Sequence, residues 1–365
     1  PYLWLVAQKE SRMTVVFITQ NHPPTFCGVG DYTAHLANSF RSLGIETHII
    51  CESGQVPGFC PDVSVHPIVE GWSGLGFGPL MDKLAEIRPD WVLMQYVPHA
   101  FHRKGMPVAL LSLYDKFARK GYRVMTFFHE VVIRPERQAK KMLAFFVQKY
   151  VAKRILQKST VAATSIDRYA AILAQLSATK KVGLIPIGSN ILPQEVSLPE
   201  RRALRERLGI AEGARVVASF GNRDVTDYLG DFDRLAADVP GLAWLIVGKT
   251  STPADVLKSR PYIYYGGPMA APDIYRHLRL ADVYFSPDII SSKGEGGSCN
   301  KSTALACGFS LGVPVVGIKG DMNNALLRDG ENILLADMAC PDHPRLRFPD
   351  RVRCSRRGCS PQGRA

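Results

Sequence analysis

The chain has 365 residues, of which 46% are hydrophobic and 21% are charged, and its formal net charge at pH 7 is +12. A chain of this length is expected to form about two domains, and this composition is typical of globular proteins that bury a core. No apolar run approaches the roughly 18–20 residues that a membrane-spanning helix needs, so no such helix is predicted.

Residues 1–12 lack a basic start followed by an apolar stretch and a small-residue cleavage site, so they predict no signal peptide. Met13 directly precedes the first strand-like run, and residues 1–12 are therefore expected to be a non-native or disordered extension. The eight cysteines include no Cys-x-x-Cys pair, which argues against a zinc site and against a dense disulfide framework. We expect reduced thiols in a cytoplasmic protein.

The first half of the chain alternates segments typical of strands with segments typical of helices. Strands are predicted over residues 13–19, 46–51, 91–97, 122–130, 161–165 and 182–188, and helices over 30–44, 108–121 and 134–158. Apolar strands that alternate with helices predict a parallel sheet covered on both faces.

A second series of strand-like segments follows an irregular, proline-bearing linker near residues 190–200. Its strands are predicted over residues 214–222, 243–249, 262–267, 281–287 and 313–320. The predicted fold class is therefore α/β, with two Rossmann-like doubly wound domains, 13–192 and 200–337, facing across a cleft. Ligands of open α/β sheets bind outside the carboxyl ends of the strands, so both sets of loops are expected at that cleft.

Residues 338–365 show no helical or strand periodicity and contain seven Arg against two Asp. Three interpretations are open: a basic arm for nucleic acid, a disordered segment, or a reading frame lost near residue 338. We favour the last, under which the second domain is incomplete and the basic pI says little about partners. No nucleic-acid partner is predicted.

The stretch TFCGVGDY contains Gly28 and Gly30, and glycines at this spacing indicate a turn that approaches a phosphate. Gly28-x-Gly30-x-x-Thr33 approximates the dinucleotide fingerprint, with Glu52 at the distance of a ribose-binding acid. That fingerprint places its first glycine at the strand end, whereas here QNHPPTFC intervenes and the third glycine is missing. The favoured alternative is a loop whose glycines approach a ligand while the following helix directs its amides at an anion.

Several segments occur in an order that resembles the retaining GT-B glycosyltransferases, a large family that uses nucleotide-sugar donors. The resemblance begins with a strand, an HPP loop, a Gly-x-Gly and a helix. It continues in FFHE (127–130), IPIGSN (185–190), the glycine strand, helix and ADVYFSP of 264–287, and GVPVVGIKGDMNNALLRDGENILL (312–335). It covers roughly residues 13–336.

The resemblance implies a donor site in the second domain. The family places an Arg and a Lys after the first strand of that domain, and this chain offers Arg223 without the Lys. The segment 294–308 supplies flexible backbone, hydrogen-bonding groups and one cation. Its predicted donor-binding residues are Gly297, Ser298, Asn300, Lys301 and Ser302. Glu295 matches the first of two family glutamates, whereas position 303, where the second is expected, is Thr.

In the first domain the resemblance places His129 near the donor sugar, and Glu130 follows it. His22 and Asp31 are candidates for an acceptor base. Cationic side chains and amides can stabilise a departing diphosphate, so neither a metal nor another cofactor is predicted.

The predicted function is transfer of a sugar from a UDP- or GDP-linked donor to a glycan or lipid-linked acceptor, with retention. Two alternatives stay open: a sugar-nucleotide epimerase of the same fold, and a degenerate homologue that binds sugar nucleotides without turnover. The basic segment 134–158 has eight Lys or Arg against one Glu, interleaved with apolar residues, and predicts either a core helix with a cationic face or a contact with an anionic membrane. The location implied is cytoplasmic or peripheral to the membrane, with a role in cell-envelope polysaccharide synthesis.

Overall fold

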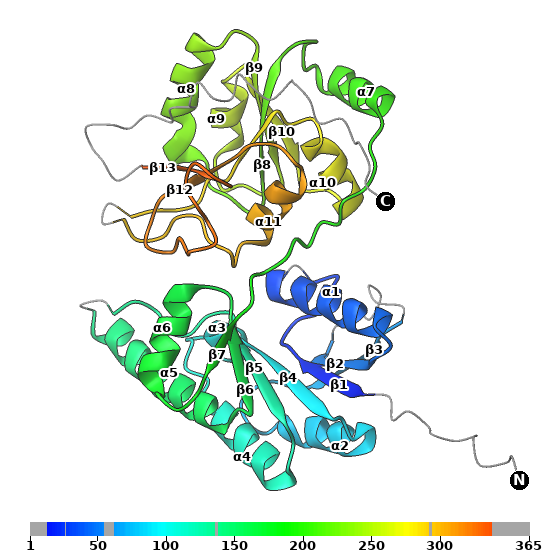
Figure 1. Ribbon diagram of the computed structural model, residues 1–365, viewed down its shortest axis with the longest axis vertical. Coiled ribbons are helices and arrows are strands. Elements are labelled where there is room, and N and C mark those ends of the chain that lie inside the picture. The colour runs from blue at the N-terminus through cyan, green and yellow to red at the C-terminus, as the bar shows by residue number, and fades with distance from the viewer. Residues whose placement is uncertain (1–12, 26, 55–61, 136–137, 292–293, 338–365) are drawn as a thin grey trace, which may run out of the picture. The chain divides into compact units, whose positions relative to one another are not determined.

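The structure is a computed structural model of the chain, and it describes residues 13–25, 27–54, 62–135, 138–291 and 294–337. The chain forms two compact α/β units that divide between Asn190 and Ile191 (Figure 1). The predicted extension at residues 1–12 and the predicted irregular tail at residues 338–365 lie outside the described residues.

The first unit contains a seven-stranded parallel sheet in the order β3-β2-β1-β4-β5-β6-β7. Its strands are β1 (Thr14–Ile18), β2 (Glu46–Glu52), β3 (Ser64–Val69), β4 (Trp91–Tyr96), β5 (Val124–Phe128), β6 (Val161–Thr164) and β7 (Val182–Leu184). Its helices are α1 (Gly28–Ser42), α2 (Phe77–Ile87), α3 (Pro98–Phe101), α4 (Leu110–Lys120), α5 (Ala139–Lys158) and α6 (Asp167–Leu176). Figure 1 shows α1 on one side of this sheet and α4, α5 and α6 on the other.

The second unit contains a six-stranded parallel sheet in the order β10-β9-β8-β11-β12-β13. Its strands are β8 (Arg215–Phe220), β9 (Leu242–Val247), β10 (Ile263–Gly267), β11 (Val283–Phe285), β12 (Val315–Ile318) and β13 (Leu334–Ala336). Its helices are α7 (Leu198–Leu208), the 3-10 turn η1 (Thr226–Tyr228), α8 (Leu229–Asp238), α9 (Ala254–Lys258), α10 (Ala271–Leu278) and α11 (Thr303–Ser310).

The central strands of both sheets are apolar because both of their faces are covered. Four consecutive β1 residues, 15–18, are at most 1% exposed, and every residue of β9 is buried. Trp244 of β9 stacks on Phe232 of α8 with ring centroids 3.6 Å apart, and its indole N–H donates to the Ser219 hydroxyl at 3.0 Å. This pair joins the sheet to its covering helix.

The strand order reverses between β1 and β4 in the first sheet and between β8 and β11 in the second. At such a switch point the loops leave neighbouring strands in opposite directions and open a crevice at their carboxyl ends. The loops after β1 and β4, with the loop after the neighbouring strand β5 beside them, therefore define one candidate region, and the loops after β8 and β11 define another.

The predicted α/β fold class with doubly wound parallel sheets is confirmed, whereas several element boundaries differ from the prediction. The helix predicted over 134–158 begins at Ala139, and Pro135 belongs to the non-helical stretch before it. The helix α1 begins at Gly28 instead of residue 30, so Gly28 and Gly30 both lie in its first turn. The strand β3 contains Pro67 and was not predicted, but it lies at the sheet edge, where proline is tolerated.

Candidate functional site

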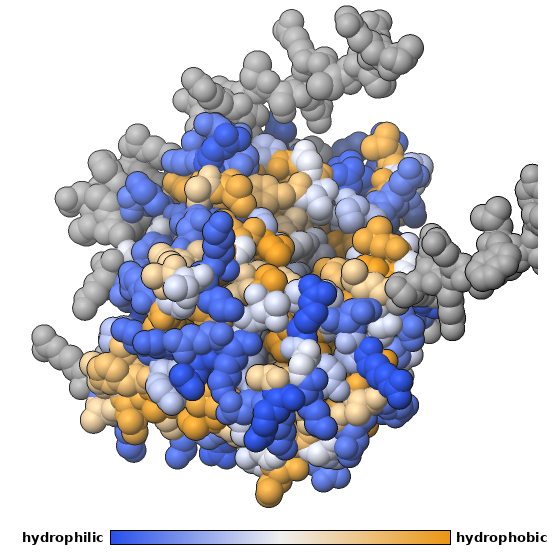
Figure 2. All heavy atoms as spheres, turned by 60° about the horizontal axis from the view of Figure 1, so that its bottom comes forward, coloured by the Kyte–Doolittle hydropathy of each residue, from blue (hydrophilic) through white to orange (hydrophobic). Residues whose placement is uncertain are grey.

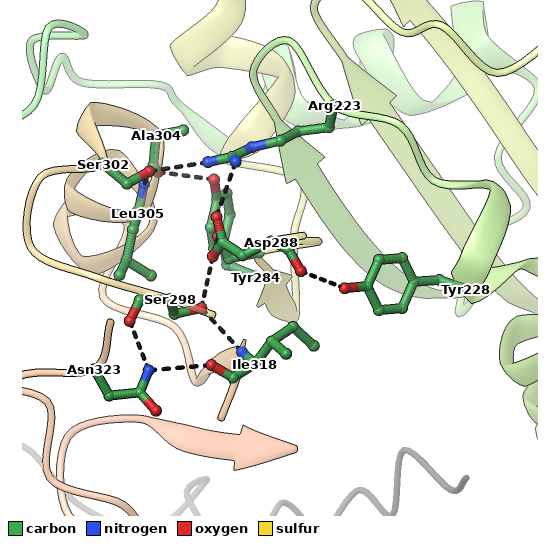
Figure 3. Close-up of polar contacts among 11 residues, drawn as sticks. Arg223, Tyr228, Tyr284, Asp288, Ser298, Ser302, Ala304, Leu305, Ile318 and Asn323 are labelled. Carbon is green, nitrogen blue, oxygen red and sulfur yellow. Dashed lines mark hydrogen bonds and ion pairs between the residues drawn. The ribbon is translucent and has the colours of Figure 1, made fainter. Parts of the chain in front are cut away.

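The first candidate site lies at the switch point of the second sheet, between β8 and β11. Arg223 follows β8 and Asp288 follows β11, so both belong to loops at the carboxyl ends of these neighbouring strands. Arg223 Nη1 and Asp288 Oδ1 lie 2.8 Å apart, and the Asp288 side chain is 8% exposed (Figure 3). The sequence singled out Arg223 but missed Asp288, whose signal was a polar residue directly after the predicted strand 281–287.

Both carboxylate oxygens and the backbone carbonyl of Asp288 have polar partners within the protein. Its Oδ2 accepts hydrogen bonds from the hydroxyls of Ser286 at 2.7 Å and Ser298 at 2.6 Å. Its backbone carbonyl accepts the Tyr228 hydroxyl at 2.6 Å, and burial raises the pKa of this phenol, which keeps it protonated as a donor. A carboxylate is costly to bury unless charge and hydrogen bonds compensate it, and both oxygens of Asp288 are compensated. Asp288 therefore fixes the position of Arg223.

Ser302 brings Arg223 to the start of α11. The Ser302 hydroxyl caps this helix by accepting the Leu305 N–H at 3.2 Å, and it also accepts from Arg223 Nη2 at 3.0 Å (Figure 3). The amides of a helix N-terminus and the aligned peptide dipoles attract anions. The Arg223 guanidinium, which Asp288 holds at the same helix end, adds N–H donors in a fixed direction, so this arrangement is suited to an anionic ligand.

Gly296 and Gly297 allow the loop before α11 to approach its neighbours closely. Both have positive φ, at 114° and 86°. A Cβ on Gly296 would lie 2.2 Å from the Ile289 carbonyl oxygen, and one on Gly297 would lie 2.8 Å from the Gly320 nitrogen. The glycines are therefore explained by contacts within the protein, and Gly297 itself is buried.

Ser298, predicted to bind the donor, is fully buried. Its hydroxyl donates to Asp288 and accepts the Ile318 N–H at 2.9 Å, so it is engaged within the protein. Asn323, which the sequence did not single out, donates from Nδ2 to the carbonyls of Ser298 at 2.6 Å and Ile318 at 3.1 Å. These bonds fasten the loop to the end of β12.

The remaining predicted residues of this loop are partly exposed: Glu295, Asn300 and Lys301. Asn300 and Lys301 occupy a turn that is closed by the Ser302 N–H donating to the Cys299 carbonyl at 3.0 Å. Burial raises the pKa of the Cys299 thiol, which keeps it protonated and unreactive. The structure thus gathers Arg223, Lys301 and Ser302 at the start of α11.

The second candidate site lies in the first unit, where His129 follows β5. His129 is 8% exposed, and its Nε2 lies 2.7 Å from Oε1 of the buried Gln95 at the end of β4. The His129 N–H donates to the Tyr96 carbonyl at 3.0 Å. The imidazole meets the Tyr32 ring edge-on, with centroids 5.3 Å apart, and lies 4.6 Å from the Phe127 ring. Gln95, whose hydrogen bond fixes the orientation of the His129 ring, has no signal in the sequence.

The first turn of α1 contains the two glycines predicted to approach the donor. A Cβ on Gly30 would lie 2.7 Å from the Asn21 carbonyl oxygen, whereas one on Gly28 would meet nothing within 4 Å. Neither glycine has positive φ. Gly30 is therefore required by the close contact with Asn21, whereas a side chain at position 28 would meet no neighbouring atom.

Two groups near this helix start were candidates for a base. His22 is fully buried, its Nδ1–H donates to the Pro23 carbonyl at 2.6 Å, and burial lowers its pKa. Asp31 is partly exposed, and burial raises its pKa to about 6. A carboxyl that titrates near pH 6 and remains accessible is the better suited of the two to accept a proton.

Within the described ranges, no cluster of three or more His, Cys, Asp or Glu side chains is arranged to hold a metal ion. Among the helices that the structure describes, none combines the length and the apolar character needed to cross a membrane.

The two doubly wound sheets match solved structures of GT-B glycosyltransferases, and this likeness shows the fold. Anabaena HepE, solved with UDP and glucose, matches with a TM-score of 0.60 at 16% identity, over 89% of this chain and 86% of HepE. A Rickettsia africae glycosyltransferase matches with a TM-score of 0.58 at 14% identity, over 84% of this chain and 79% of its own. A Listeria monocytogenes protein assigned as a UDP-N-acetylglucosamine 2-epimerase matches with a TM-score of 0.52 at 12% identity, over 84% of this chain and 79% of its own. Comparisons with protein-family models and with curated protein sequences give no match.

Proposed function

We propose that the chain transfers a sugar from a UDP- or GDP-linked donor to a glycan or lipid-linked acceptor. The observation that carries the proposal is the position of Arg223, which Asp288 and Ser302 hold at the start of α11. A guanidinium and helix-terminal amides both stabilise the diphosphate that departs during sugar transfer. The solved HepE complexes with UDP and UDP-glucose support this class of donor.

In the donor site, we assign the diphosphate to Arg223, Ser302 and Lys301. Asn300 and Glu295, on the partly exposed part of the same loop, would contact the nucleotide sugar, with Glu295 at the transferred sugar. Gly297 and Ser298 would act from the interior, by holding the loop in place. Because cations and amides supply the stabilisation of the leaving group, the proposal includes no metal, and retention rests on the family resemblance.

In the first unit, we assign His129 to a sugar hydroxyl or to the reacting centre, with Gln95 as the residue that orients it. Gly28 and Gly30 belong to the helix start that we assign to the donor–acceptor junction. Asp31, with a pKa of about 6, is assigned as the candidate acceptor base.

The epimerase alternative is supported by the Listeria neighbour and predicts a new sugar nucleotide formed without any acceptor. The degenerate alternative is supported by the missing Lys after Arg223 and by Thr303 in place of a glutamate, and it predicts nucleotide binding without turnover. Product analysis of a donor panel, with and without acceptor sugars, separates both alternatives from transfer.

Isothermal titration of the full chain with UDP and GDP tests the donor site. Replacing Arg223 with Ala should weaken binding of the preferred nucleotide about 10- to 100-fold, because a charge-assisted contact to the diphosphate is lost. Lys301→Ala should weaken binding by a smaller factor. Lys301 belongs to a partly exposed turn, so this variant tests the site even where Arg223→Ala disturbs the buried Asp288.

The matched control is Arg276→Ala, which removes an arginine that pairs with Asp273 on the surface of α10. This variant should bind UDP or GDP as the unchanged chain does. Full nucleotide affinity in both Arg223→Ala and Lys301→Ala, or tight binding of NAD instead, would overturn the assignment.

The same proposal includes a cytoplasmic or membrane-peripheral location and a role in cell-envelope polysaccharide synthesis. It also includes an anionic membrane partner that contacts the segment 134–158. They follow from the lipid-linked class of acceptor and from the charge of that segment.

A further inference from the structure

We propose that the hydroxyl of Tyr32, near the start of α1, binds a hydroxyl group of a sugar substrate beside His129. The inference rests on the proposed function and deepens it, because it names a group that the first unit offers to the sugar. That sugar is either the one that the donor carries or the one at the acceptor, and the two arms of the experiment separate these sources.

The ring of Tyr32 is held in place by residues of β5, β6 and the segment after β7. Its centroid lies 5.7 Å from that of Phe127, and 5.3 Å from that of His129, which it meets edge-on at 80°. Tyr32 also packs against the buried cluster of Phe127, Ala163 and Ile187. A tyrosine side chain has only two χ angles, so a packed ring leaves its hydroxyl in a nearly fixed position.

The hydroxyl of Tyr32, unlike its ring, has no hydrogen bond within the part of the chain that the structure describes. The buried hydroxyls of Tyr114, Tyr228 and Tyr284 each have a partner at 2.6 to 2.7 Å. The Tyr96 hydroxyl has none among the described residues, but Tyr96 is fully buried and therefore out of reach of a ligand. Tyr32 is partly exposed, so its hydroxyl is available to a bound molecule.

Partial exposure alone does not single out Tyr32, because hydrophobic and hydrophilic side chains are interspersed over the surface that Figure 2 presents. What distinguishes Tyr32 is its position. It directly follows Asp31 and contacts His129, whose Nε2 lies 2.7 Å from Gln95 Oε1. Gln95 and His129 lie at the carboxyl ends of β4 and β5, the edge at which open α/β sheets bind their ligands.

The chemistry of the phenol favours a sugar hydroxyl over a phosphate. Burial raises the pKa of Tyr32 to about 12, so the hydroxyl stays neutral at physiological pH. A neutral phenol can donate one hydrogen bond and accept another, as a sugar hydroxyl can. A diphosphate is better matched by a cation and helix-terminal amides, which Arg223 and α11 offer in the second unit.

The alternative role for Tyr32 is packing, in which the ring only holds His129 in place. The two roles use different atoms, because packing needs the ring and binding needs the hydroxyl. Tyr32→Phe keeps the ring and removes the hydroxyl, whereas Tyr32→Ala removes both. A loss of sugar binding in Tyr32→Phe therefore supports the inference, and a loss in Tyr32→Ala alone assigns the residue to packing.

The first arm of the experiment tests the donor's sugar. The full chain is titrated calorimetrically with UDP-glucose, UDP-galactose and GDP-mannose, and with UDP and GDP alone. If the donor's sugar contacts Tyr32, Tyr32→Phe should weaken binding of the preferred nucleotide sugar about three- to tenfold, because one hydrogen bond is lost. Binding of the bare nucleotide should not change.

The second arm tests the acceptor. Saturation-transfer NMR measures binding of glucose, galactose and mannose to the chain loaded with its preferred nucleotide. If the acceptor sugar contacts Tyr32, Tyr32→Phe should weaken binding of the free sugar by the same factor and leave binding of the nucleotide sugar unchanged.

The matched control is Tyr122→Phe. Tyr122 is a partly exposed tyrosine of the same unit, its ring packs on Phe117 with centroids 6.2 Å apart, and it precedes β5, whereas His129 follows this strand. This variant should bind every probe as the unchanged chain does. The inference is overturned if Tyr32→Phe binds nucleotide sugars and free sugars normally, or if Tyr122→Phe loses as much affinity.

The unchanged chain separates this result from a failure of the proposed function. If it binds neither nucleotides nor nucleotide sugars, the proposed function is overturned and the inference with it. Normal binding by both the unchanged chain and Tyr32→Phe overturns the inference alone.

Discussion

The two switch points use the same sheet topology but hold their polar residues by different means. In the second unit, Arg223 and Asp288 are a charged pair with hydroxyl partners around the carboxylate. In the first unit, a hydrogen bond joins His129 to Gln95, and aromatic rings lie against the imidazole. Guanidinium N–H groups held in a fixed direction suit an anionic leaving group, whereas an imidazole and an amide suit the recognition of hydroxyl groups.

Removal of the buried carboxylate should have the largest effect on stability. Asp288→Ala would leave Arg223 without its counter-charge and Ser298 without an acceptor, which costs about 3–5 kcal/mol in the free energy of unfolding. Urea denaturation measures this difference. Asp273→Ala, which breaks a half-exposed pair with Arg276, is the control and should change stability by at most about 1 kcal/mol. Equal effects of the two substitutions would contradict the role given to Asp288.

Removal of Gln95, the hydrogen-bond partner of His129, should have a smaller effect on stability. Gln95→Leu would leave the buried His129 Nε2 without its hydrogen bond, at a cost of about 1–3 kcal/mol. If Gln95 orients His129, sugar transfer should fall further than this loss of stability explains, because the ring loses its fixed position.

Gln95→Glu provides a second readout at the same position. A carboxylate at hydrogen-bond distance favours the protonated imidazole, so the pH profile of transfer should move to higher pH. An unmoved profile, together with normal transfer by Gln95→Leu, would assign Gln95 to packing alone.

The smallest effect is expected from the pH dependence of Asp31. Burial raises its pKa from 3.8 to about 6, so the native state binds this proton more tightly than the unfolded chain does. The contribution is present at low pH and is lost as the pH rises through about 6. Asp31→Asn should therefore be slightly more stable than the unchanged chain at pH 7.5, by less than about 1 kcal/mol, with no gain near pH 4. Thermal unfolding at the two pH values measures this difference, and a gain at the lower pH would contradict it.

Much of the candidate donor site could be predicted from the sequence, because Arg223, Lys301 and Ser302 belong to local patterns near predicted strand and helix ends. Asp288 and Asn323 could not, because their partners are distant in the sequence. Asp288 is 65 residues from Arg223, and Asn323 is 25 residues from Ser298. No local pattern shows which polar side chain meets which across a crossover.

The sequence by itself determined the alternation of apolar strands and helices, and hence the two doubly wound sheets, because hydrophobic periodicity is a local property. It also determined where the positive charge lies. The tertiary structure alone decided which residues are buried. Gly297 and Ser298 lie in the interior, and Gly30 allows the helix start to approach the Asn21 carbonyl. It also decided that the buried residues of α5 lie between Gln148 and Leu156. Burial depends on what neighbouring strands and loops bring to a residue, and that arrangement is set by packing across the fold.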